Sequence, residues 1–384
     1  MFNDKIICTL GSGAFAGTKV VLVELKNEEI NVAAIKMFDR QSDLVRSRSK
    51  AIFQEKLVME RLSENYDDKN INSFSKYIIK LYNKLKDDTM LYLIMEAALG
   101  GPLHKHLQQA STIDIFDVDT IIKYSAEIIT GLNYLALKGC IHRDLKLSNC
   151  FLDRYGHIQI GDFGCSRILY DSGAWISVKA GGSERAPRGY TIIGTPHMMA
   201  PECFTKNGHS LGCDWWSLGA LIYEMLTKKP AFSNLYNVSI NDAINLTNIE
   251  EEKEEDKEEL NKIFELNFDV SFNNAFDNKL NQSGYSTKTT LIPKVDMQNL
   301  IEGLMNKCET SRYNPWNLDK LKSHNVFKIL NINWEAIENG TALSPRNDFD
   351  KRLGALEIVE EREMKNDQNE EKLTDEQQAL FQSF

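Results

Sequence analysis

The stretch from Ile141 to Arg167 decides the fold, and it reads IHRDLKLSNCFLDRYGHIQIGDFGCSR. Two apolar runs, within NCFLD and HIQIGD, predict two short strands. Polar and charged side chains stand directly before the first run and directly after the second. Loops held by rigid strands are where binding and catalytic residues concentrate. We therefore expect this stretch to carry the chemistry of the protein.

On either side of this stretch, the chain changes from strands to helices near residue 100. The first 40 residues predict three antiparallel strands, within KIICTLGSG, TKVVLVEL and NVAAIKMF. A helix is expected from Ser42 to Ser63, then a loop over 64–76, and two more strands between Tyr77 and Met95 around KDDT. Further apolar helices are predicted over Val118 to Lys138, Leu211 to Lys228 and Met297 to Lys307. This order indicates an α+β chain with a strand-rich lobe before a helical lobe.

A glycine-rich turn lies between the first two expected strands, in LGSGAFAGTKVVLV from Leu10 to Val23. Glycines at such a turn let backbone amides approach phosphate oxygens, although a plain hairpin has the same pattern. Lys36 ends the third expected strand, and Glu55 lies 19 residues later on the expected helix. An ion pair between them would hold the Lys36 ammonium against the phosphates of a nucleotide.

Four motifs follow one another along the chain: HRDLKxxN from His142, DFG from Asp162, APE from Ala200 and DWWSLG from Asp214. Their order resembles that of the eukaryotic protein kinases. The resemblance covers about residues 5–330 and implies a bilobal kinase-like α+β fold, with a small β-rich N-lobe carrying one main helix and a larger helical C-lobe. It places the N-lobe at 5–97, the C-lobe at 98–330 with an acidic insertion near 233–293, and a C-terminal tail at 331–384.

The resemblance also implies how the site would act with ATP and Mg²⁺. Asp144 would accept the proton of the acceptor hydroxyl, Lys146 would neutralise charge on the transferred phosphoryl group, and Asn149 with Asp162 would bind Mg²⁺. The remaining expected contacts are structural: Phe163 beneath the helix of Glu55 with Met59, Leu81 and His142, a buried Glu202–Arg312 ion pair, and Asp214 bracing the catalytic loop. The residues expected around ATP are Leu10, Gly11, Ser12, Gly13, Ala14, Phe15, Ala34, Lys36, Glu55, Met95, Glu96, Ala98, Phe151, Asp162 and Phe349.

Within the kinases, the chain resembles the AGC group and its cyclic-nucleotide-dependent members. TIIGTP from Thr191 resembles their activation segment, which implies that an upstream kinase phosphorylates Thr191, that Arg143 and Arg167 bind the phosphate, and that Thr195 contacts Asp144. The hinge LYLIMEAALGGPL resembles cGMP-dependent kinases, and the terminal FQSF resembles the docking motif of the cAMP-dependent catalytic subunit. Two alternatives stay open: a separate catalytic subunit held by a cyclic-nucleotide-binding regulatory subunit, or a piece of a larger cGMP-dependent chain.

The sequence departs from the kinase pattern at several points. Ala16 stands where the third loop glycine is usual, and Glu202 follows Asp162 by 40 residues, which makes the activation segment long. Pro102 and Ser148 occupy two positions where the resembling kinases carry glutamates that read substrate arginines, whereas Glu224 is retained. We therefore expect a weakened demand for arginine two and three residues before the acceptor. A catalytically inactive pseudokinase or scaffold, and a stand-alone AGC kinase without cyclic-nucleotide control, are the alternative functions.

Composition excludes several other classes of protein. The net charge of −10 argues against a nucleic-acid binder, and 42% hydrophobic residues are enough for a sizeable core. Two stretches, 250–259 and 356–384, carry −6 each, so the rest of the chain is nearly neutral. Seven cysteines without a CxxC motif favour a reducing compartment, and no apolar run is long enough to span a membrane. We expect a cytoplasmic protein acting on protein substrates, with the nucleus as an alternative location.

Overall fold

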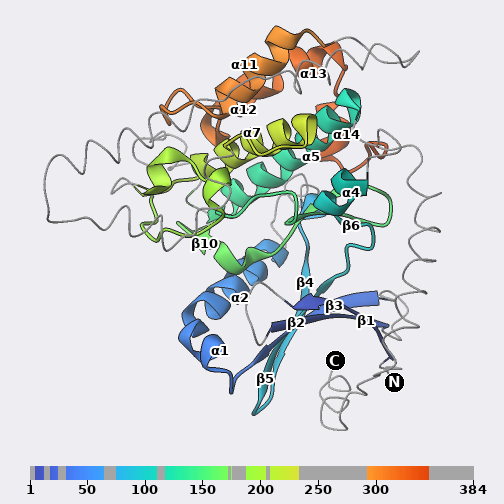
Figure 1. Cartoon of the computed structure of the whole chain (residues 1–384), viewed down its shortest axis with the longest axis vertical. Coiled ribbons are helices and arrows are strands. Elements are labelled where there is room, and N and C mark those ends of the chain that lie inside the picture. The colour runs from blue at the N-terminus through green and yellow to red at the C-terminus, as the bar shows by residue number, and fades with distance from the viewer. Residues whose placement is uncertain are drawn as a thin grey trace, which may run out of the picture.

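The computed structural model describes residues 5–12, 18–24, 32–64, 75–109, 117–171, 174, 187–204, 208–232 and 292–345. Side chains are described from Val32 onward, Leu44 excepted. The acidic insertion at 233–291, the end of the tail at 346–384 and residues 13–17 of the glycine loop lie outside the described residues. The expected α+β organisation is confirmed, with a β-sheet region at one end and a stack of helices at the other (Figure 1).

The β-sheet region is an antiparallel five-stranded sheet with the order β1-β2-β3-β5-β4. The five predicted strands are β1 (Lys5–Ser12), β2 (Thr18–Glu24), β3 (Val32–Asp39), β4 (Leu81–Lys86) and β5 (Met90–Glu96). Strand β3 lies at the centre of the sheet, and its side chains are buried from Ala33 to Phe38. Lys36 is therefore held within the sheet, opposite Leu93 of β5.

The helix expected from Ser42 to Ser63 is divided into α1 (Asp43–Ser47) and α2 (Ser49–Ser63). The break lies at Arg48, whose φ and ψ are −107° and 13° and whose N–H turns back to the carbonyl of Val45. Helix α2 buries Glu55, Val58, Met59 and Leu62 on one face, next to the sheet (Figure 1). This face brings Glu55 toward β3.

The helical region is built around α5 (Val118–Leu137) and α7 (Gly212–Thr227), which are buried along almost their whole length. A helix that is apolar on all sides belongs in a core. The side chain of Asp117 caps α5 by accepting from the N–H of Thr120 at 2.7 Å. Helix α11 runs over Lys294–Leu304, so it begins and ends three residues before the predicted range, directly after Pro293. The remaining helices are α4 (Leu103–Gln109), α12 (Leu318–Lys322), α13 (Asn325–Ile329) and α14 (Trp334–Glu338).

Short elements connect the two regions and carry the decisive stretch. Strands β8 (Cys150–Leu152) and β9 (Ile158–Ile160) confirm the two predicted strands and form a small sheet with β6 (Gly101–Pro102). Strand β7 (Cys140–Ile141) pairs with β10 (Arg167–Ile168). Single turns of 3-10 helix are η1 (Ser75–Tyr77), η2 (Phe163–Cys165), η5 (Pro196–Met198), η6 (Pro201–Phe204) and η9 (Pro315–Asn317).

Candidate active site

Lys36 is the first residue of the site and makes two ion pairs. Its Nζ lies 2.6 Å from Oε1 of Glu55 and 3.0 Å from Oδ1 of Asp162. Lys36 and Glu55 are only 7% and 3% exposed. The predicted pairing of these two residues is confirmed. Asp162, which lies near the C-terminal end of the Ile141–Arg167 stretch, is the second partner of Lys36.

Burial and charge act in opposite directions on these groups. Burial alone would lower the pKa of Lys36, but Glu55 and Asp162 raise it on balance. Burial alone would raise the pKa of Asp162, but Lys36, aided by Lys146, lowers it on balance. The ammonium and the Asp162 carboxylate are therefore both charged near neutral pH.

Asp144 is the centre of a second cluster. Its Oδ1 accepts a hydrogen bond from Oγ1 of Thr195 at 2.6 Å, and its Oδ2 lies 2.8 Å from Nζ of Lys146. Nζ of Lys146 also donates to Oγ1 of Thr195 at 2.9 Å. Nδ2 of Asn149 donates to the backbone carbonyl and to Oδ2 of Asp144, at 2.8 and 3.0 Å. The expected contact between Thr195 and Asp144 is confirmed.

The backbone before Asp144 is held in an unusual conformation. Arg143 has φ of +68°, which is rare for a residue with a side chain. The carboxylate of Asp214 accepts from the N–H of His142 at 2.7 Å and from the N–H of Arg143 at 2.8 Å. Asp214 thus braces the catalytic loop as expected, because both its oxygens fix the strained peptides.

Phe163 joins the two regions of the molecule. Its ring is fully buried, and its centroid lies 5.3 Å from that of His142. Nε2 of His142 lies 3.0 Å from the carbonyl oxygen of Gly161. Met59 of α2 is buried, and Leu81 of β4 packs against the same core.

The residues expected around adenine lie on β3, on β5 and the segment that follows it, and on β8. Ala34 pairs in register with Met95, and both Met95 and Ala98 are half-buried against the core. Phe151 of β8 is also half-buried, and a Cβ at Gly161 would lie 3.2 Å from its ring. The side chains of Leu10, Gly11 and Ser12 are not described, and Gly13, Ala14, Phe15 and Phe349 lie outside the described residues.

The donor set fits a magnesium ion. Because Nδ2 of Asn149 is engaged with Asp144, the group that Asn149 can offer to a cation is its oxygen Oδ1. Asp162 uses Oδ1 for Lys36, and its side chain is 40% exposed. Oxygen ligands of this kind suit Mg²⁺, which keeps several waters and bridges phosphates.

The activation segment crosses the catalytic loop at Gly194. Gly194 has φ of +127°, and a Cβ there would lie 2.4 Å from the carbonyl oxygen of Arg143. Only glycine permits this approach, which brings the neighbouring Thr195 to Asp144. Thr191 is exposed, four residues before Thr195.

Arg143 and Arg167, the expected phosphate ligands, lie close to His209. NH1 of Arg143 lies 3.0 Å from Nε2 of His209, and Nε of Arg143 donates to the carbonyl of Cys165 at 2.6 Å. Burial lowers the pKa of His209 to about 3, assisted by Arg143, Arg167 and Arg188. His209 is therefore neutral and can accept from Arg143. No motif surrounds His209, so sequence reasoning did not identify it.

Of the three positions at which the resembling kinases bind substrate arginines through glutamates, only Glu224 carries an acidic side chain here. Glu224 of α7 is half-buried, and burial raises the pKa of its carboxyl to about 7. Pro102 pairs with Phe151 in the small sheet, and Ser148 directly precedes Asn149 in the catalytic loop. Neither Pro102 nor Ser148 can supply a negative charge.

The chain is similar to known protein kinases, as the motifs and the geometry of the site lead one to expect. The protein kinase domain family matches residues 5–327, so the chain belongs to the protein kinase domain family. It is similar to a Caenorhabditis elegans protein described as "cAMP-dependent protein kinase, catalytic subunit-like", with 33% identity over 240 residues, covering 62% of this chain and 52% of the relative. It is 34% identical to mouse cGMP-dependent protein kinase 2 over 235 residues, covering 61% of this chain and 26% of the relative.

A third relative is the human "cAMP-dependent protein kinase catalytic subunit PRKX", 33% identical over 226 residues, with 59% of this chain and 54% of the relative covered. These similarities confirm the resemblance to the cyclic-nucleotide-dependent kinases. The chain spans about half the length, or less, of these curated relatives.

Replacing Lys36 with methionine is expected to lower kcat/KM for ATP about 100-fold. The substitution removes the cation between Glu55 and Asp162, and hydrogen bonds from a charged donor to phosphate are among the strongest in proteins. Steady-state kinetics at varied ATP would measure the loss. Lys50→Met, at an exposed position of α2, is the matched control and should stay within about twofold of the wild type. A folded Lys36→Met variant with nearly full kcat/KM would contradict the expected role of Lys36 in binding the phosphates of ATP.

Proposed function

We propose that this chain is a serine/threonine protein kinase that transfers the γ-phosphate of MgATP to hydroxyl groups of protein substrates. The observation that carries the proposal is the contact of Asp144 with Thr195, Lys146 and Asn149. A carboxylate held by an activation-segment hydroxyl is suited to orient an acceptor oxygen, and the ammonium beside it is suited to neutralise charge on a phosphoryl group.

Each residue has a distinct role in this proposal. Asp144 accepts the proton of the acceptor hydroxyl and aims its oxygen at phosphorus. Lys146 balances charge on the transferred phosphoryl group, and Lys36, fixed by Glu55, binds the phosphates on the other side. Asn149 and Asp162 would hold Mg²⁺, which supplies positive charge to the phosphate oxygens. Phosphoryl transfer requires mainly this positioning and charge balance.

The alternative is a catalytically inactive pseudokinase. Such a protein keeps the fold and loses one or more of the groups that bind phosphate, bind metal or accept the proton. Lys36, Glu55, Asp144, Asn149 and Asp162 are all present, and they contact one another in two clusters. The intact set favours an active enzyme.

The chemical class of the acceptor can be tested directly. The full chain would be incubated with Mg²⁺, γ-³²P-labelled ATP and three peptides whose only hydroxyl acceptor is serine, threonine or tyrosine. We expect label on the serine and threonine peptides. Label on the tyrosine peptide alone would contradict the proposed acceptor class, and no label on any peptide would support the pseudokinase.

For the substrate, we propose a weak and pH-dependent preference for arginine upstream of the acceptor. With Pro102 and Ser148 uncharged, Glu224 is the one acid retained of the three positions named above. Its pKa of about 7 means that the carboxylate, and with it the preference, is present above pH 7 and is lost below it. The ratio of kcat/KM for arginine-containing and alanine-containing peptides should be about 5 at pH 8 and approach 1 at pH 6.

Both peptides undergo the same chemical step, so the pH dependence of that step cancels in the ratio of their kcat/KM values. Glu224→Gln should give a ratio near 1 at both pH values. A strong arginine preference that does not change with pH, or one that survives in Glu224→Gln, would contradict the proposal.

For regulation, we propose phosphorylation of Thr191 by an upstream kinase, with Arg143 and Arg167 as phosphate ligands, and control by cyclic nucleotides through a regulatory partner. The support is the exposure of Thr191 and the similarity to cAMP- and cGMP-dependent kinases. Capture of purified regulatory subunits on the immobilised chain, with and without cyclic AMP or cyclic GMP, tests the partner. Capture that one nucleotide reverses would support this control, whereas no capture would favour the stand-alone kinase.

For location, we propose the cytoplasm, with the nucleus as the alternative. None of the helices in the described part of the chain combines the length and apolar content that a membrane span requires. No disulfide joins the six cysteines whose side chains are described. Free thiols are usual in a reducing compartment.

A further inference from the structure

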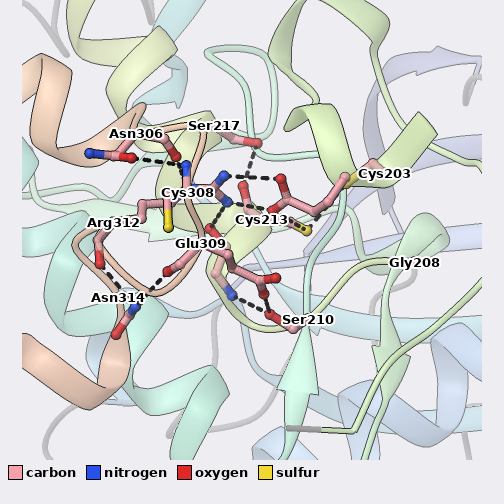
Figure 2. Close-up of polar contacts among 12 residues, drawn as sticks. Cys203, Gly208, Ser210, Cys213, Ser217, Asn306, Cys308, Glu309, Arg312 and Asn314 are labelled. Atoms are coloured by element: carbon pink, nitrogen blue, oxygen red, sulfur yellow. Dashed lines mark hydrogen bonds and ion pairs between the residues drawn. The ribbon is translucent and has the colours of Figure 1, made fainter. Parts of the chain in front are cut away.

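Two cysteines outside the proposed active site bring their sulfur atoms into contact. Cys203 lies in η6, at the end of the activation segment, and Cys213 lies in the first turn of α7 (Figure 2). Their Sγ atoms are 3.2 Å apart, and the residues are 8% and 4% exposed. Of the six cysteines with described side chains, these two alone form a sulfur–sulfur contact.

The two thiols adjoin the ion pair that fastens the activation segment. Sγ of Cys213 donates to Oε1 of Glu202 at 3.4 Å. The carboxylate of Glu202 also accepts from both terminal nitrogens of Arg312, which is fully buried and lies over the ring of Trp216. A change at these sulfur atoms is therefore transmitted to the anchor of the activation segment.

The other buried thiols have different surroundings. Sγ of Cys140 donates to the carbonyl of Lys138, and burial alone raises the pKa of Cys150 to about 12. An isolated thiol of this kind acts as a small apolar side chain. A pair in contact has an additional reaction available, because each sulfur is within reach of the other.

We propose that Cys203 and Cys213 form a modification site at which a hydroperoxide produces a reversible intramolecular disulfide. In the first step, the Cys203 sulfur attacks an oxygen of hydrogen peroxide; the O–O bond breaks, Cys203 becomes a sulfenic acid, and the thiol proton passes to the leaving oxygen, which departs as water. In the second step, the Cys213 sulfur attacks the Cys203 sulfur and the sulfenic oxygen leaves as water. Two thiols and one hydrogen peroxide thus give one disulfide and two waters, with two electrons passing from sulfur to peroxide.

The geometry favours this order of steps. Cys203 is the more exposed of the two and is the one that a small oxidant reaches first. Burial raises the pKa of Cys213, so its proton stays in place until the attack, and the neighbouring Glu202 oxygen can receive it on the way to water. A disulfide requires a sulfur–sulfur distance of about 2.0 Å, so the two side chains need to approach by roughly 1 Å.

The disulfide would tie η6 to the start of α7. A cross-link across so short a loop removes conformational freedom from the unfolded chain, and we expect the unfolding midpoint to rise by about 5 °C. Reduction with dithiothreitol should return the midpoint to its original value. The modification therefore acts as a covalent reinforcement of the anchor formed by Glu202 and Arg312.

Peptide mapping of the full wild-type chain tests the proposal. The protein would be treated with hydrogen peroxide, denatured in an alkylating agent, and digested with trypsin without reductant. Lys206 lies between the two cysteines in the sequence, so trypsin separates their peptides and a disulfide shows as two linked peptides that dithiothreitol releases. We expect the linked pair Cys203–Cys213. Cys308 is exposed, and hydrogen bonds with Thr310 and Ser311 lower its pKa to about 7. Oxidation of Cys308 therefore reports that the oxidant has acted.

Variants separate this site from other oxidation. Cys203→Ser and Cys213→Ser should each abolish the peroxide-induced rise in unfolding midpoint, while Cys308→Ser should keep it. The proposal is overturned if wild-type protein with fully oxidised Cys308 yields no Cys203–Cys213 peptide, or if either cysteine is found linked to another partner instead. The mapping on wild-type protein decides the question even if a variant does not fold.

Discussion

The Asp144→Asn variant is expected to lose about 1,000-fold in kcat while keeping its fold and its affinity for nucleotide. An amide of the same shape can still accept from Oγ1 of Thr195 but cannot take the proton of the acceptor hydroxyl. Lys36, Glu55 and Asp162 are untouched, so the phosphate-binding side of the site persists. Steady-state kinetics with a serine peptide would measure kcat, and binding of a fluorescent ATP analogue would measure affinity.

The matched control is Asp319→Asn. Asp319 lies exposed in the first turn of α12, and the same change of charge there should leave kcat within about twofold of the wild type. If Asp144→Asn retained more than a tenth of the wild-type kcat, Asp144 would not be the proton acceptor, and the proposed mechanism would be wrong.

The Arg312→Met variant is expected to lower the free energy of unfolding by about 3–5 kcal/mol, the largest effect on stability that we predict. The substitution leaves the Glu202 carboxylate buried without its cation. It also removes donors to the carbonyls of Asn306 and Gly212, at 2.9 and 3.2 Å. Urea denaturation followed by circular dichroism would give the difference.

The double variant Glu202→Gln/Arg312→Met separates the ion pair from simple loss of packing. Removing the charge of Glu202 as well should recover part of the lost stability, because a buried carboxylate that has lost the Arg312 cation carries a desolvation penalty. Arg154→Met, at an exposed arginine beside Tyr155, is the control and should change stability by less than about 1 kcal/mol. A loss of that small size for Arg312→Met would contradict the structural role assigned to the pair.

Contacts that rest on motif residues could be predicted from the sequence. Lys36 and Glu55, Glu202 and Arg312, and Asp214 with the catalytic loop are separated by 19 to 110 residues, yet each partner stands in a recognisable position. The strands and the long helices followed from apolar periodicity. The break between α1 and α2 at Arg48 did not, because nothing in the local sequence requires it.

Other contacts arise only when segments without a motif meet in the folded chain. His209 reaches Arg143 because its strand-like bridge with Gly189 carries it there, and both residues lie in irregular segments. Cys203 and Cys213 touch because η6 folds back onto the start of α7. Their spacing in the sequence resembles no metal or disulfide pattern, so only the structure identifies the pair.

One measurement tests the central claim most directly: transfer of ³²P from labelled MgATP to a mixed serine and threonine peptide substrate, with wild type and Asp144→Asn assayed side by side. The proposed kinase predicts peptide labelling by the wild type that exceeds the variant by about 1,000-fold. Equal labelling by the two proteins, at the level of a reaction without protein, would contradict the account and leave a nucleotide-binding protein without phosphoryl transfer.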